Sequence, residues 1–116
     1  MAFTAINVAV DTSAAHTMVA ADSSNGNKFL NDGVGRLLIY NPDGAAIVCT
    51  IAIPADADTA LVDGLTIPDY AISTSAVAYV VRPLRRELYN VRSGTDAGAV
   101  TMTWTGTVTN VKLAVI

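Results

Sequence analysis

The stretch that decides the fold is AVTMTWT, residues 99–105, in which Val100, Met102 and Trp104 alternate with three threonines. A period of two residues places alternate side chains on opposite faces of an extended strand, whereas a helix repeats every 3.6 residues. The segment therefore predicts a β-strand with one buried and one exposed face. Trp104 is expected on the buried face, as a core anchor.

The segments on either side extend this interpretation. Gly106 marks a turn, and residues 108–116 predict the last strand, in which Lys112 and Ala114 face away from the core. On the other side, residues 84–90 are expected to hold one helical turn. The C-terminal third of the chain is thus predicted to be mostly extended.

Asn41-Pro42-Asp43-Gly44 is the strongest turn signal, because proline presets φ at the second turn position and glycine suits the position that closes it. It lies between two β-rich runs, residues 36–41 and 45–53, which are predicted to pair as an antiparallel hairpin. The bulkier face of the second run is expected to point into the core, and it consists of Ile47, Cys49, Ile51 and Ile53.

Shorter β-rich runs predict four further strands, at residues 5–10, 16–21, 70–75 and 77–82. Residues 1–4 are expected to form a short arm, and residues 54–69 a long loop. The chain, residues 1–116, is therefore predicted to be one all-β domain, an antiparallel β-sandwich or barrel of about seven to eight short strands.

Composition favours strands and a covered surface. Hydrophobic residues make up 52% of the chain and charged residues only 15%, against about 25% charged in an average domain. Glu87 is the only glutamate, there is no glutamine, and there are only two lysines, so the usual residues of a solvated helix face are nearly absent. So uncharged a surface is expected either to be covered largely by Thr, Ser, Asn and Ala, or to be partly buried against partner proteins.

Charge and hydropathy argue against two classes of partner, nucleic acids and membranes. A net charge of −3 and a pI of about 4.7 argue against nucleic acid, which requires a basic surface. No apolar run reaches the 18 or more residues of a membrane-spanning helix, so no membrane partner is expected. The first residues lack the positive charge of a signal peptide, which predicts a protein made and used without Sec-type export.

The sequence offers no recognisable catalytic or metal-binding set. His16 and Cys49 are the only histidine and cysteine, too few for a catalytic triad or a zinc site. Asp56 and Asp58 lack the spacing and glycine of a calcium loop, which favours a solvated acidic loop. No catalytic, cofactor-binding or metal residue is predicted, and the protein is not expected to be an enzyme.

One basic cluster has the composition of a protein interface, because arginine and tyrosine are enriched at interface hot spots. It lies within residues 82–92, and its arginines are four of the chain's seven positive residues. The alternative is pairing within the chain, with Glu87 and loop aspartates such as Asp96. The candidate interface consists of Arg82, Arg85, Arg86, Tyr89 and Arg92.

Five pieces of sequence, taken in order, also carry a family resemblance. They are Asn31-Asp32-Gly33 with the strand 37–41, the segment 64–70, Pro83 with Leu88-Tyr89-Asn90, the strand 100–104, and residues 108–116. In this order and spacing the chain resembles the small β-barrel capsid decoration (cement) proteins of tailed double-stranded DNA phages. It departs from the family at Arg82-Pro83-Leu84-Arg85, where members carry a Gly-Pro-Phe-Pro type of segment.

The resemblance implies a virion structural protein that is made in the host cytoplasm and lies on the capsid exterior, with the major capsid protein as its partner. It also implies a homotrimer at three-fold positions that clamps neighbouring capsid subunits. The alternatives are a phage tail or head–tail connector component and a carbohydrate-binding module, which would require exposed aromatic rings.

Overall fold

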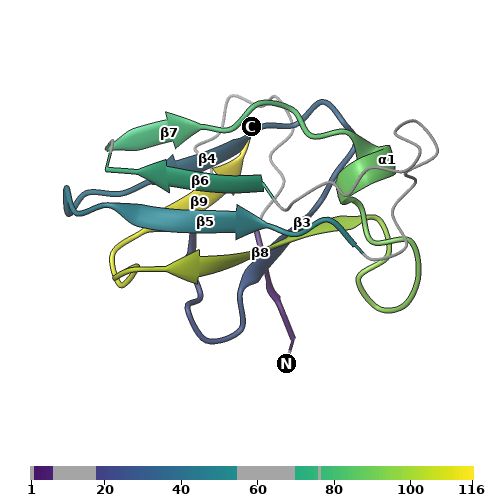
Figure 1. The fold of residues 1–116 in the computed structure, drawn as a ribbon, viewed down its shortest axis with the longest axis horizontal. Coiled ribbons are helices and arrows are strands. Elements are labelled where there is room, and N and C mark those ends of the chain that lie inside the picture. Colours follow the sequence, from purple (N-terminus) through teal and green to yellow (C-terminus); the bar gives the residue numbers. More distant parts are fainter. Residues whose placement is uncertain (1, 7–17, 55–69, 76) are drawn as a thin grey trace.

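The computed structural model describes residues 2–6, 18–54, 70–75 and 77–116. These form two β-sheets and one short helix, α1 (Arg86–Tyr89). The sheets pack face to face without closing into a barrel, so the sandwich prediction is confirmed (Figure 1). Most of the predicted first strand, His16, and Asp56 and Asp58 lie outside the described residues.

The first sheet has five strands in the order β1-β3-β8-β5-β6. Neighbours are antiparallel except β1, which runs parallel to β3. Its strands are β1 (Thr4–Ala5), β3 (Asn27–Leu30), β8 (Ala99–Thr105), β5 (Ile47–Ile51) and β6 (Tyr70–Thr74).

The second sheet has four strands in the order β2-β9-β4-β7, all antiparallel. They are β2 (Val19–Ala20), β9 (Lys112–Val115), β4 (Leu37–Tyr40) and β7 (Ala78–Val80). The described part of the chain therefore has nine strands, of which β3 was not predicted. β3 has only four residues and lies between turn-forming residues on both sides, so the sequence shows no strand pattern there.

The predicted hairpin is wrong, because β4 and β5 belong to different sheets (Figure 1). The turn itself is present, and the Asn41 side chain closes it by donating Nδ2 to the carbonyl of Ala45 at 2.8 Å. Both strands have one strongly apolar face, and crossing between the sheets lets the two faces meet in the core. A hairpin would instead have placed both strands in one layer.

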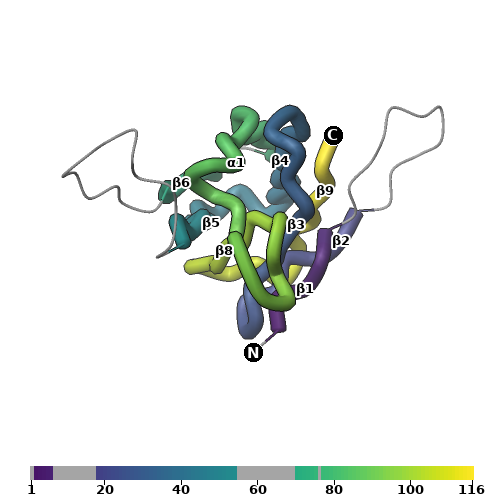
Figure 2. The backbone as a smooth tube through the Cα atoms, turned by 90° about the vertical axis from the view of Figure 1, so that its right-hand side faces the viewer, coloured from purple at the N-terminus to yellow at the C-terminus, as the bar shows by residue number. Residues whose placement is uncertain are grey.

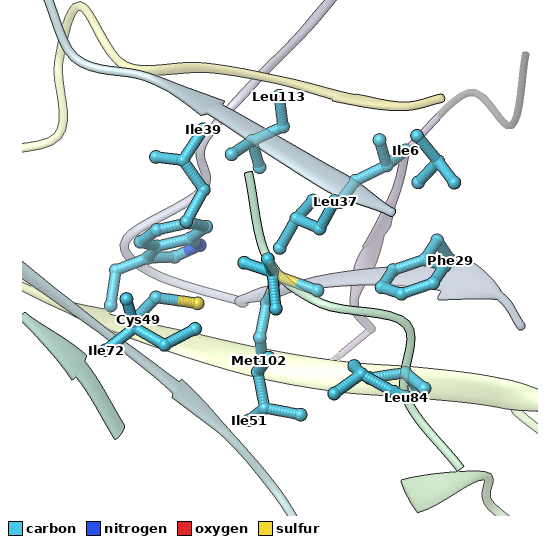
Figure 3. Packing of buried hydrophobic residues seen from close by; sticks show 14 of the residues in the cluster. Ile6, Phe29, Leu37, Ile39, Cys49, Ile51, Ile72, Leu84, Met102 and Leu113 are labelled. Atoms are coloured by element: carbon cyan, nitrogen blue, oxygen red, sulfur yellow. The ribbon is translucent and has the colours of Figure 1, made fainter. Parts of the chain in front are cut away.

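Figure 3 shows the core between the sheets. Leu37, Ile39 and Leu113 of the four-stranded sheet face side chains of the five-stranded sheet such as Cys49 and Met102, and all are at most 1% exposed. The buried faces predicted for β5 and β8 are thus confirmed, including Trp104 at 9% exposure, but Ala99 and Thr101 on the face of β8 that was expected to be exposed are buried as well. Ala114 was expected on the opposite face of its strand, but it too is buried.

The predicted helical turn is confirmed as α1, which lies at one end of the sandwich (Figures 1 and 2). Leu84 just before it and Tyr89 within it are buried in the core. These two apolar anchors hold the short helix against the ends of the sheets.

Candidate protein interface

The structure places the predicted interface residues along the segment that leaves β7 and passes through α1. Arg82 follows β7, Arg85 and Arg86 lie at the start of α1, and Arg92 lies in the loop after it, all exposed. Tyr89 is only 6% exposed and belongs to the core. The exposed surface of this segment therefore includes four arginines and Glu87, whereas Tyr89 packs in the core beneath them.

Arg82 is held by tyrosines. Its guanidinium carbon lies 4.7 Å from the centre of the Tyr70 ring, within the range of a cation–π interaction. Hydrogen bonding to the Tyr70 side chain, with a smaller contribution from Tyr89, raises the pKa of Arg82. Among the described residues, no carboxylate lies within ion-pair distance of Arg82.

Arg85 has a local carboxylate partner. Its Nε atom lies 3.8 Å from Oε2 of Glu87, and the two side chains are 60% and 49% exposed. An ion pair this long and this exposed contributes little, under about 1 kcal/mol. The pairing with Glu87 that was the alternative to an interface is thus present, but it is weak enough for a partner to displace.

Arg86 lies against the turn at residues 32–35. A Cβ atom at Gly33, where φ is +85°, would be 3.6 Å from Cγ of Arg86. The pKa of Asp32 is lowered mainly by hydrogen bonds from the backbone of Gly35 and Val34, with a smaller effect from the charge of Arg86. Arg86 therefore adds positive charge beside a turn whose carboxylate is already satisfied.

Two asparagines fix this end of the sandwich. Asn31 Nδ2 donates to Oδ1 of Asn90 at 2.8 Å and to the Leu84 carbonyl at 3.0 Å. Asn90 Nδ2 donates back to the Asn31 carbonyl at 3.1 Å and to that of Gly98 at 3.2 Å. Such a satisfied network rigidifies the segments that it joins. The sequence shows Asn31 and Asn90 only as turn residues, so their pairing was not predictable.

Asp96 does not pair with the arginines. Its Oδ1 lies 2.8 Å from Nζ of Lys28, in a half-buried ion pair. The pair borders a hollow of about 260 Å³ that Ile6 and Leu30 also line. That volume is below the range of typical ligand pockets.

The outer face of the four-stranded sheet carries exposed apolar side chains beside two exposed basic ones, since Arg36 pairs with Ile116 and Lys112 pairs with Tyr40. Leu37 and Ile39 point into the core, so Leu38 and Tyr40 point outward, and Val80 pairs with Leu38 on the neighbouring strand. Tyr40 is 39% exposed, and Val80 and Ile116 are both 46% exposed. We call the surface formed by Leu38, Tyr40, Val80 and Ile116 the outer apolar face.

The described residues contain no group of three or more metal-ligating side chains. Cys49 is buried in the core, as predicted, and burial raises the pKa of its thiol to about 12. A thiol with so high a pKa is not a nucleophile at neutral pH.

No family model, no curated protein and no solved structure matches this chain. None of the helical structure in the described ranges is long and apolar enough to span a bilayer.

Proposed function

We propose that this protein is a virion structural protein that binds the outer surface of an assembled phage capsid and stabilises it as a decoration (cement) protein. In this proposal its partners are the major capsid protein and further copies of itself in a homotrimer. A protein that binds only the assembled lattice stabilises that lattice by mass action.

The observation that carries the proposal is the outer apolar face. Tyr40, Val80 and Ile116 expose between 39% and 46% of their surface on the outer side of the four-stranded sheet, with Leu38 between them and Lys112 beside Tyr40. Contiguous apolar surface on a protein commonly marks an interaction site. Together with the charge-poor composition and the sequence resemblance, it favours a protein that works between protein neighbours.

The arginine segment supports the same proposal. Arg85 and Arg86 are exposed, and the backbone beneath them is held by the hydrogen bonds between Asn31 and Asn90. A planar guanidinium on a rigid base can bond a carboxylate through two parallel hydrogen bonds. We therefore assign to these two arginines contacts with acidic groups of a neighbouring chain.

The alternative of a carbohydrate-binding module has less support. Sugar binding requires exposed aromatic rings. Of the seven aromatic residues, Tyr40 is the most exposed, at 39%, and the other six are buried or partly buried. Phe29, Tyr89 and Trp104 are buried, and the face of Tyr70 is covered by Arg82. A tail or connector component would use the same kind of surface, so its position in the particle is what distinguishes it.

The test is co-sedimentation of the purified protein with expanded capsids and with unexpanded precursor capsids of the phage that encodes it. Binding to expanded capsids alone supports the proposal, since the decoration site forms on expansion. Absence of binding to expanded capsids contradicts it. Binding on a glycan screen would instead favour the carbohydrate-binding module.

A further inference from the structure

Strand β7 is an edge of the four-stranded sheet with unused hydrogen-bonding groups. The Asn41 N–H donates to the Val77 carbonyl, and the Val81 N–H donates to the Leu37 carbonyl, both at 2.8 Å. Residues 77 and 81 therefore direct their backbone groups toward β4. Alternate residues of an antiparallel strand direct these groups to opposite sides.

It follows that Ala78 directs its N–H and C=O away from β4, as Val80 does. Within the described ranges, these four groups have no hydrogen-bond partner. Free backbone groups of this kind are a template on which another strand can pair.

Apart from its short length of three residues, β7 lacks the usual protection of a sheet edge. Protected edges carry charged side chains, proline or a bulge. Residues 77–81 have the sequence VAYVV, which contains neither a charged residue nor a proline. The first charged residue after β7 is Arg82, and the first proline is Pro83. Val77 is 57% exposed and Val80 46% exposed, so the edge presents apolar side chains as well as free backbone.

We propose that β7 pairs with β7 of a second copy of this chain, antiparallel across a two-fold axis that passes midway between the two Tyr79 residues. In this register Ala78 of each copy lies opposite Val80 of the other, and the four free groups of each strand make four hydrogen bonds in all. The contact is isologous, so each copy offers the other the same surface.

The edge is complementary to itself in charge as well as in hydrogen bonding. Arg82 lies three residues from the axis in each copy and at opposite ends of the paired strands. At about 3.3 Å per residue, the two Arg82 Cα atoms are separated by roughly 20 Å along the strands. No like charges therefore face each other, and the outer apolar faces of the two copies become continuous.

The other described edge on this side, β6, fits a second copy less well. Thr50 and Val48 pair with β6 residues Ala71 and Ser73, which are exposed but small or polar. The Ala52 N–H donates to the Thr101 carbonyl of β8. The even-numbered residues of β5 therefore direct their backbone N–H and C=O groups toward β8. Ala71 and Ser73 hence direct their backbone groups outward, which makes Ser73 a matched control position.

The pairing is independent of the capsid proposal, since it rests on the geometry of β7 alone. If trimers occupy three-fold positions on a capsid, neighbouring trimers are related by two-fold axes, and this contact is of the kind that would join them.

Sedimentation velocity over a wide concentration range tests the proposal. The wild-type protein is expected to double its molar mass reversibly as concentration rises. Ala78→Pro removes an outward N–H without removing a hydrogen bond to β4. It should lower the association constant of the dimer at least tenfold. Ser73→Pro makes the same change on β6 and should leave the doubling intact.

Disulfide cross-linking checks the register and does not depend on how well the proline variants fold. Residues opposite each other in a hydrogen-bonded pair have Cα atoms about 5.5 Å apart, within disulfide reach. A mixture of Ala78→Cys and Val80→Cys should therefore cross-link more than either variant alone, while buried Cys49 stays unreactive. Unchanged mass at all concentrations, doubling that survives Ala78→Pro, or equal cross-linking by either variant alone would overturn the proposal.

Discussion

The indole Nε1 of Trp104 donates a hydrogen bond of 2.8 Å to Oδ1 of Asn27, which is fully buried. The same oxygen accepts the backbone N–H of Asp22 at 2.8 Å. Nδ2 of Asn27 donates to the carbonyls of Thr4 at 3.3 Å and Ala20 at 3.4 Å. Because Thr4 belongs to β1 and Ala20 to β2, one amide joins the edges of both sheets.

Asn27→Leu is expected to lower the free energy of unfolding by about 2–4 kcal/mol, because it leaves the buried Trp104 donor and the partly buried Asp22 donor without an acceptor. Trp104→Phe removes one donor and keeps an aromatic ring, so it should cost about 1–2 kcal/mol. Trp104→Ala should cost about 3–5 kcal/mol through the cavity that it leaves. Urea denaturation measures all three. A smaller loss for Asn27→Leu than for Trp104→Phe would contradict the role given to the amide.

Two glycines with the same backbone conformation should respond differently to alanine. Gly26 and Gly44 have φ of +76° and +71°, so each Ala variant pays about 1 kcal/mol for a left-handed residue. A Cβ at Gly26 would lie 2.4 Å from the Met102 carbonyl oxygen and 2.8 Å from the Phe3 ring, whereas at Gly44 it would meet nothing within 4 Å. Thermal melts should show a much larger loss for Gly26→Ala. Equal melting temperatures would contradict the packing at Gly26.

Asp22 should make stability depend on pH in the acid range. The Thr4 hydroxyl donates to its carboxylate at 2.6 Å, and this bond is the largest cause that lowers the pKa of Asp22 below 3.8. A lowered pKa in the folded state gives stabilisation that is complete above the unfolded pKa and is lost as pH falls through the folded pKa. Thr4→Val should raise the pKa of Asp22, as followed by carboxyl NMR titration, and Asp22→Asn should flatten the stability profile below about pH 4. An unchanged pKa in Thr4→Val would count against the bond.

The arginine segment is tested by Arg85→Ala combined with Arg86→Ala. Within the described part of the chain, the ion pair affected is the exposed Arg85–Glu87 contact, so the melting temperature should barely change while capsid binding falls. Arg85→Lys with Arg86→Lys keeps the charge but loses the planar fork, and its affinity should be intermediate. Normal capsid binding by the double alanine variant at all salt concentrations would move the contact surface elsewhere.

The strands that carry long, regular alternation could be predicted from the sequence. The alternation in residues 99–105 and 45–53 assigned the correct buried faces, because period two is a property of the strand alone. The pairing of strands was less predictable. Asn41-Pro42-Asp43-Gly44 is a turn in either a hairpin or a crossing between sheets, and local turn chemistry does not distinguish the two.

The exposed residues of the candidate interface were predictable from the sequence, but the buried residues that hold this segment in place were not. The exposure of Arg82, Arg85 and Arg86 follows from charge, whereas the burial of Tyr89 depends on how α1 docks on the sheets. Asn27 and Asn31 look like surface turn residues in the sequence. Their buried roles depend on partners such as Trp104, 77 positions away along the chain, and no local pattern contains that information.

The most direct test of the proposed function is a cryo-EM reconstruction of expanded capsids, with and without saturating amounts of the purified protein. The account predicts added density on the capsid exterior at three-fold positions, with three copies of the β-sandwich at each. Added density confined to the tail vertex would identify a connector component instead. A capsid surface that is unchanged by the protein would contradict the proposed decoration function.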